Sequence, residues 1–121
     1  MRSEPTPPAM LAELNAHPMA QRCWRNHLLH DHECQGRLTW EHAVTHAGRR
    51  VNEVWAIVRI CAYAHEVDQF QDGGGMVKEI NRWIAFSRIE NWGAVLAKYP
   101  RTSWPHDYWY LKRKYGDTRI E

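Results

Sequence analysis

The run VWAIVRI at residues 54–60 is the feature that most constrains the fold of this 121-residue chain. Its Val, Ile and Trp side chains are typical of a buried β-strand. A second segment, residues 37–44, begins with alternating apolar and polar side chains (LTWE), which predicts a half-buried strand. The stretch THAGRRVNE between them breaks this period around Gly48 and is expected to be a loop. The two strands are therefore predicted to form a hairpin.

Helices are expected around this hairpin. The alternation stops at Cys61, so the next ten residues are interpreted as a helix entered directly from the strand. Apolar residues at helical spacing after the glycines at 73–75, and a proline in the first turn of the last segment, predict three more helices. The predicted helices span residues 9–15, 61–70, 76–89, 91–99 and 103–115. The expected fold class is α+β.

Length and composition favour one domain of a soluble protein. We expect residues 1–20 to be a flexible extension with a short helix, residues 21–75 to form the core, and residues 76–121 to form a helical part packed on that core. No apolar run approaches the ~20 residues of a membrane span. The first residues also lack the apolar segment of a secretory signal. The chain is therefore expected to be cytoplasmic, with no membrane partner.

The polar residues with chemical potential fall at the joints of these elements. Glu41 and His42 end the first strand, Asn52 lies in the loop, and His65 follows Cys61 by one helical turn. If the helix packs across the hairpin, His65 can face Glu41 and His42. Such ligands suit Mg²⁺ or Mn²⁺, and in a mixed set Zn²⁺. A neutral imidazole beside the cation can take a proton from water.

The order EH, then Asn, then His on a strand–loop–strand–helix resembles the HNH endonucleases, which have the ββα-metal fold. This likeness covers residues 34–65, about a quarter of the chain. The span from CQGRLTWEHA through NRWIAFSRI is also similar to small HNH-type proteins of phages and prophages. The resemblance implies a hairpin-plus-helix core with added C-terminal helices and hydrolysis of DNA phosphodiester bonds. It also implies phage recombination or packaging proteins as candidate partners.

The resemblance also implies roles for single residues. His42 matches the general base that activates water, and Glu41 and His65 match the ligands of the catalytic metal. Asn52 matches the asparagine that orients the base or joins the metal shell.

The chain departs from the family pattern in two ways. Glu41 stands where aspartate is usual, and Asn52 precedes Cys61 by nine residues, a longer spacing than in many members. Glu53 or His46 could therefore take the place of Asn52.

A structural zinc site is a further prediction. Many HNH domains hold zinc on paired CxxC motifs, which this sequence lacks, but Cys34 and Cys61 flank the hairpin and Cys23 lies nearby. A tetrahedral Zn²⁺ takes four nitrogen or sulfur ligands. The fourth ligand would be one of His27, His30 and His32. The alternative is that Cys61 is only a small buried hydrophobe.

Three functions remain in competition. In a nuclease, Arg49 and Arg50 would contact the phosphates beside the scissile bond, although solvation of the surface also explains them. The second candidate is a zinc-stabilised nucleic-acid-binding module without hydrolysis. The third is a protein-interaction adaptor that uses the aromatic helices after residue 76.

Overall fold

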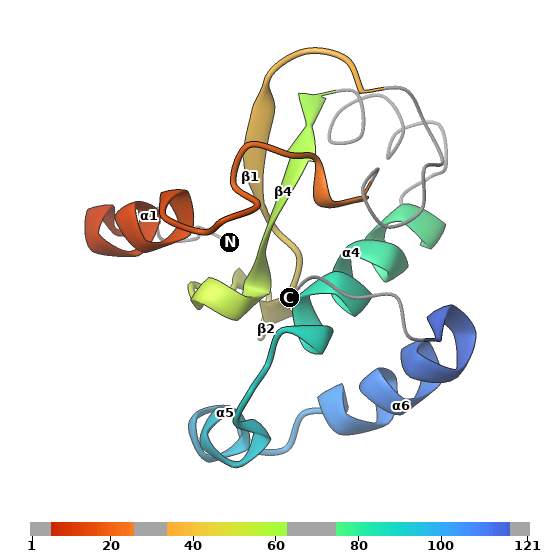
Figure 1. Ribbon diagram of the computed structural model, residues 1–121. Helices are drawn as coiled ribbons and strands as arrows, with labels where there is room; N and C mark the ends of the chain where they lie inside the picture. Colours follow the sequence, from red (N-terminus) through yellow and green to blue (C-terminus); the bar gives the residue numbers. More distant parts are fainter. Residues whose placement is uncertain (1–5, 26–33, 63–74, 117–121) are drawn as a thin grey trace.

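The computed structural model describes residues 6–25, 34–62 and 75–116 (Figure 1). These residues form four α-helices, one 3-10 turn and two small antiparallel sheets, so the fold is mixed α+β, as the sequence predicts. In chain order the elements are α1 (Pro8–Asn15), β1 (Leu38–His42), β2 (Thr45–His46), β3 (Arg49–Arg50), η1 (Val54–Ala56), β4 (Ile57–Cys61), α4 (Gly75–Ser87), α5 (Trp92–Lys98) and α6 (Trp104–Tyr115).

The central pair of strands is β1 and β4. They run antiparallel, and their register extends from Leu38 opposite Cys61 to His42 opposite Ile57. Four of the five residues of β4 are buried and only Arg59 is half-buried, which explains the nearly continuous apolar run in the sequence. The prediction of a strand over residues 54–60 is wrong for residues 54–56, which form the 3-10 turn η1. The strand begins at Ile57.

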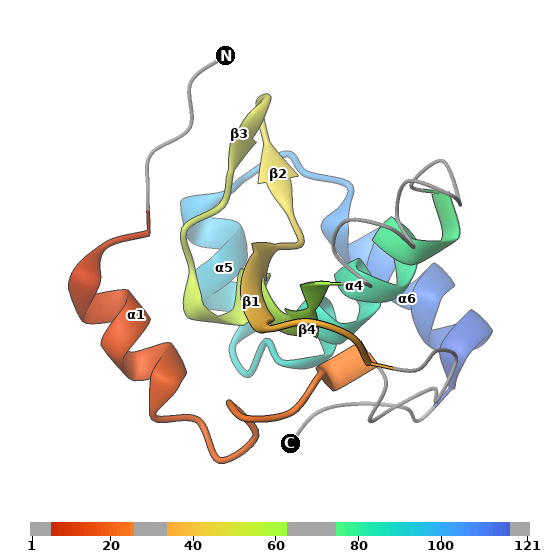
Figure 2. The same ribbon diagram turned by 90° about the horizontal axis from the view of Figure 1, so that it is seen from above.

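The loop predicted between the two strands contains a second, two-residue hairpin. Thr45 pairs with Arg50 and His46 pairs with Arg49, and the hairpin projects beyond β1 (Figure 2). Its turn residues, Ala47 and Gly48, have φ values of 53° and 77°. Two consecutive residues with positive φ match the right-handed twist of paired strands. The glycine that predicted a loop therefore closes a hairpin.

The core lies where α4 crosses β4. Trp24, Ile84 and Phe86 are fully buried there, together with the apolar side chains of β4. The α4 helix ends at Ser87, two residues before the predicted end, and Arg88 turns back onto the core. Its guanidinium donates to the carbonyl oxygens of Val54 and Ile57 at 3.1 and 2.8 Å. Burial lowers the pKa of Arg88 to about 10.

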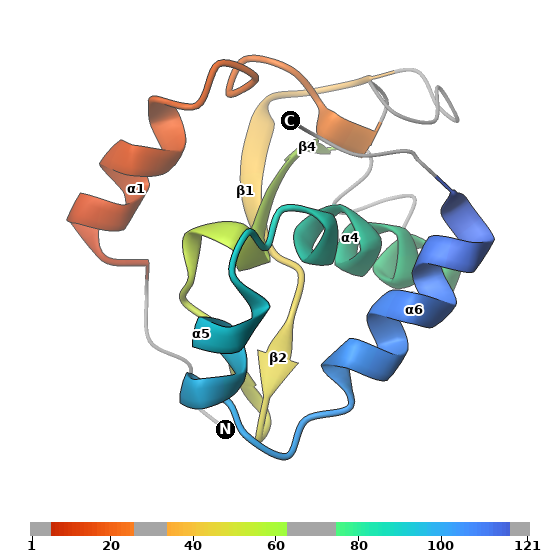
Figure 3. The ribbon, with the colours of Figure 1, turned by 60° about the horizontal axis from the view of Figure 1, so that its bottom comes forward.

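The helices around the core follow the predicted pattern. Asn91 caps α5 by accepting a hydrogen bond from the Ala94 amide at 3.0 Å. The α6 helix has Pro105 in its first turn, and Gly116, whose φ is 66°, follows its last residue. The α6 helix lies beside α4 (Figure 3). Of the helix predicted over residues 61–70, only Cys61 and Ala62 belong to the described residues.

The α1 helix packs on the side of the strands away from α4 (Figure 1). Leu14 is fully buried, and the Asn15 amide oxygen accepts a hydrogen bond from the Trp40 indole at 3.0 Å. The Ala20 carbonyl accepts one from Arg59 at 2.8 Å. Residues 8–20 are thus tied to the strands, where the sequence predicted a flexible extension.

A pair of identical substitutions tests the position of the core. Trp24 is 0% exposed and Trp109 is 59% exposed. Trp24→Ala should lower the free energy of unfolding by about 3–5 kcal/mol, because it leaves a large cavity. Trp109→Ala should change it by no more than about 0.5 kcal/mol. Urea denaturation of both variants measures the difference, and equal effects would contradict this core.

Candidate functional site

The first component of the site is a histidine–asparagine pair at the end of β1. His42 is the last residue of β1, and Asn52 follows the small hairpin, whose base is closed by the hydrogen bond from the Val51 amide to the Val44 carbonyl at 3.0 Å. This fold-back brings the His42 Nε2 and the Asn52 Oδ1 to 2.7 Å. An amide oxygen only accepts, so Nε2 carries the proton and the lone pair of the neutral ring is on Nδ1.

The surroundings of His42 favour the neutral imidazole. Burial lowers the pKa of His42, the hydrogen bond to Asn52 partly raises it, and the nearby charge of Arg50 lowers it again. A histidine with a lowered pKa keeps its lone pair at neutral pH, which is what a general base needs.

Glu41 shares a cleft with His42. The cleft has a volume of about 410 Å³ and lies between the end of β1, the α4 helix and the start of α6. Its lining residues are Glu41, His42, Ala43, Thr45, Lys78, Asn81, Arg82, Ser103 and Trp104. The Glu41 Oε2 accepts a hydrogen bond from the Asn81 Nδ2 at 3.1 Å. Glu41 and His42 both line this cleft, but consecutive residues of a strand point to opposite faces. The Glu41 carboxylate turns to Asn81 of α4, and the His42 ring turns to Asn52 and Thr6.

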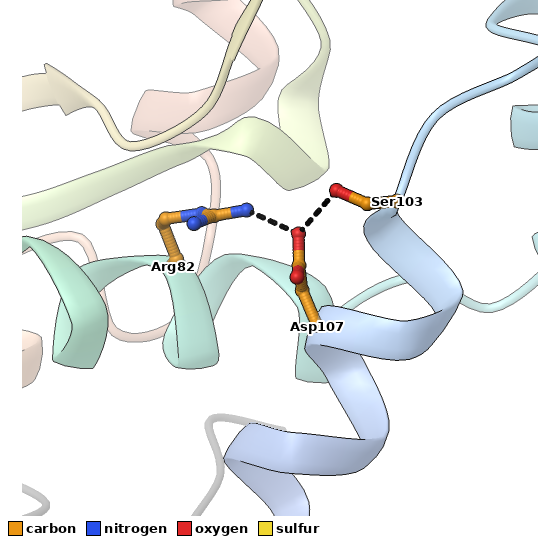
Figure 4. Close-up of polar contacts among 3 residues, drawn as sticks. All are labelled: Arg82, Ser103 and Asp107. Carbon is orange, nitrogen blue, oxygen red and sulfur yellow. Dashed lines mark hydrogen bonds and ion pairs between the residues drawn. The ribbon is translucent and has the colours of Figure 1, made fainter.

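One wall of this cleft is fixed by a polar junction between α4 and α6. The Asp107 Oδ2 accepts hydrogen bonds from the Arg82 guanidinium at 2.8 Å and from the Ser103 hydroxyl at 3.0 Å (Figure 4). Arg82 and Ser103 both line the cleft. The junction directs the Arg82 charge toward Asp107.

The three cysteines form a second group. The sulfur atoms of Cys23, Cys34 and Cys61 all lie within 4.8 Å of one another, with Cys23 and Cys61 buried and Cys34 exposed. Burial and the two neighbouring sulfurs raise the pKa of Cys34 to about 12. A bound cation reverses this effect, since thiols lose their protons to metals. Three such sulfurs could hold a metal ion such as zinc.

The cysteine group and the histidine–asparagine pair lie at opposite ends of the central strands, because Cys61 pairs with Leu38 and Ile57 pairs with His42. A tetrahedral zinc needs one more ligand than the three sulfurs. The predicted candidates His27, His30 and His32 lie outside the described residues, as does His65.

The remaining predicted site residues have other surroundings. Glu53 accepts hydrogen bonds from the Tyr99 hydroxyl and from Lys98. The His46 ring packs on Tyr99, with ring centroids 5.3 Å apart. The residue beside His42 is therefore Asn52, and neither alternative takes its place. Arg49 and Arg50 are exposed on β3.

Sequence reasoning missed the contribution of α4 to the cleft. Asn81 is buried between the apolar neighbours Ile80 and Trp83, and it reaches Glu41 from a helix that was expected only to pack on the core. The available signal was a small amide in the buried stripe of an amphipathic helix, since buried polar groups need a partner.

Comparisons with protein-family models, with curated proteins and with solved structures found no match for this chain. Among the described residues, none of the helices has the length and apolar character needed to span a membrane.

Elemental analysis tests the cysteine group. The purified protein should carry about one zinc ion per chain, and Cys34→Ser should remove it, because a tetrahedral site loses one of its ligands. Loss of the metal should lower the melting temperature by about 10 °C or more, since ligand binding stabilises only the folded state. His42→Ala, at the other end of the strands, should keep the zinc. A wild-type protein free of metal would contradict the site.

Proposed function

We propose that this chain is a metal-dependent endonuclease of the HNH type that hydrolyses phosphodiester bonds in DNA. The hydrogen bond between the His42 Nε2 and the Asn52 Oδ1, at 2.7 Å, carries the proposal. It joins two residues that the resemblance assigns to one site, and Glu41 lines the same cleft. In this interpretation β1, β4 and the helix predicted after Cys61 are the ββα-metal core.

The proposed chemistry follows from the orientation of His42. With Nε2 held by Asn52, the His42 Nδ1 is the atom that takes a proton from a water molecule in this proposal. Asn52 keeps the ring in the required tautomer and orientation. A carboxylate and an imidazole fit a divalent cation, so Glu41 and His65 would hold Mg²⁺, Mn²⁺ or Zn²⁺. Such a cation stabilises the negative charge that builds on the phosphate.

The charges around the cleft suit a phosphodiester. Lys78 is exposed and lines the cleft, and Arg49 and Arg50 are exposed on the hairpin that follows β1. Cations placed in this way contact the DNA backbone and supply affinity without sequence information. The resemblance further suggests a cytoplasmic phage enzyme that works with recombination or packaging proteins.

The cysteine group favours a second candidate function. Three sulfurs within 4.8 Å of one another would stabilise the fold through a metal whether or not the cleft is catalytic. The chain would then be a zinc-stabilised nucleic-acid-binding module without hydrolysis. The two functions differ in whether DNA is cut.

Replacement of the proposed base tests the nuclease directly. His42→Ala should lower the rate of nicking of supercoiled plasmid in Mg²⁺ or Mn²⁺ by about 10²–10⁴-fold, the usual contribution of a general base. DNA binding should persist, because the arginines remain. His106→Ala, an exposed histidine on α6, is the matched control and should cut at the wild-type rate.

A chelator should abolish nicking in every variant that cuts. If the folded His42→Ala variant cuts at the wild-type rate, His42 is not the general base. Salt-sensitive binding by the wild-type protein, with no nicking in either metal, would favour the binding module.

The phosphate contacts are tested by salt dependence. Arg49→Ala should weaken binding to DNA of any sequence and reduce the slope of log K against log salt by about 1, the value for one lost phosphate contact. Fluorescence anisotropy at several salt concentrations gives the slope. Arg22→Ala removes an equally exposed arginine beside the cysteine group and should leave the slope unchanged. Equal slopes for wild type and Arg49→Ala would show that Arg49 does not contact the DNA backbone.

A further inference from the structure

We propose that the outer face of α6 binds single-stranded nucleic acid, with the rings of Trp109 and Tyr110 stacking on bases and Arg113 contacting phosphates. The outer face consists of the exposed residues Trp109, Tyr110, Lys112 and Arg113. This inference goes beyond the proposed function, because it assigns a second binding surface and does not depend on hydrolysis in the cleft.

The two sides of α6 differ in character. Trp104 and Leu111 are buried in the core on the inner side of the helix. On the outer face, Trp109 is 59% exposed and Tyr110 is 46% exposed. Arg113 lies beside both rings, because residues three and four positions apart are neighbours on a helix surface. The helix itself lies at the edge of the fold (Figure 3).

Core packing does not explain these two rings. Among the described residues, the other exposed large apolar side chain is Leu11 on α1. A single exposed apolar side chain is common and needs no explanation. Trp109 and Tyr110 are instead adjacent on one face, and an aromatic ring left in water gives up the stabilisation that its burial would bring. A ligand that covers the rings would recover this stabilisation.

The charge of this face suits a polyanion. Lys112, Arg113 and Lys114 follow the rings, with no acid among them. In the part of the chain that the structure describes, Lys114 is bound to Glu79 at 2.6 Å, and neither Lys112 nor Arg113 has an acidic partner. The Lys112 ammonium lies 5.2 Å from the centroid of the Trp109 ring. Positive charge that attracts phosphate therefore lies next to rings that can stack on bases.

The small area of the rings favours a nucleic acid over a protein partner. Stable protein interfaces bury about 800 Å² on each side, around an apolar centre. The described part of α6 exposes two aromatic rings and no large aliphatic side chain, which is a small centre for such an interface. One ring is enough for one base, because every base has a flat π-face. Single strands present such faces, whereas the bases of a duplex are stacked on one another.

Fluorescence anisotropy with a short labelled thymidine oligomer, in buffer without added Mg²⁺ or Mn²⁺, tests this surface. Trp109→Leu keeps an apolar side chain but removes the ring. Its Kd should be about 5–150-fold weaker than the wild-type value, the range for one lost stacking contact. Trp109→Phe keeps a ring and should recover most of the affinity. Leu11→Ala removes an exposed apolar side chain on α1 and should bind as the wild-type protein does.

Salt and strand pairing separate the two kinds of contact. Arg113→Ala should reduce the slope of log K against log salt by about 0.7, the value for one phosphate of a single strand, whereas Trp109→Leu should leave the slope unchanged. Annealing the complementary adenosine oligomer should remove the effect of Trp109→Leu, because paired bases do not reach the ring. A uridine oligomer distinguishes RNA from DNA, and the same loss in Trp109→Leu with either strand would support the stacking face.

Equal Kd values of the wild-type protein and Trp109→Leu for the single strands would overturn the proposal. A wild-type protein that binds no oligomer, but forms a dimer in analytical ultracentrifugation that Trp109→Leu dissociates, would also overturn it. The outer face would then bind a second copy of the chain.

The outcomes are distinct from those of the proposed function. Plasmid nicking by a protein whose oligomer binding does not depend on Trp109 would keep the nuclease and overturn the stacking face. Oligomer binding that depends on Trp109, in a protein that never nicks plasmid, would keep the stacking face and overturn the nuclease.

Discussion

The antiparallel pairing of β1 with β4 sets the positions of both candidate sites. Cys61 pairs with Leu38 at one end and His42 pairs with Ile57 at the other. At about 3.3 Å per residue, these ends lie about 13 Å apart. Burial of β4 on both faces fixes the register, since a slip by one residue would exchange the faces of every side chain. The core packing of β4 therefore keeps the cysteine group and the cleft apart and each in its place.

Local patterns in the sequence predicted the parts of the fold that depend on local physics. The apolar stripes of α4 and α6 appear where expected, because burial of one face imposes a period on the chain. The strand β1 also forms where predicted, with all five of its residues half-buried. The β2–β3 hairpin was missed because its strands are too short for a period, and its turn depends on the left-handed backbone of Ala47 and Gly48. Contacts between distant elements leave no such period. No local pattern therefore predicts the hydrogen bond between Asn81 and Glu41. The one sequence signal was an amide side chain on the buried face of α4.

The association of the three cysteines was predicted from residue type alone. Cys23, Cys34 and Cys61 are distant in sequence, yet their predicted association holds because the start of β1 and the end of β4 are neighbours. Which histidine would complete a zinc site depends on segments outside the described residues. His65 follows Cys61 by four residues. It is thus a candidate for the fourth zinc ligand as well as for the metal beside Glu41.

We propose that the chain binds a structural metal at one end of the β1–β4 pair and a catalytic divalent cation at the other. Anomalous diffraction from one crystal soaked in Mn²⁺, recorded at the zinc and manganese edges, tests it most directly. We expect a zinc peak among the sulfurs of Cys23, Cys34 and Cys61, and a separate manganese peak beside Glu41. A cleft without manganese, or manganese bound only at the cysteines, would contradict the account.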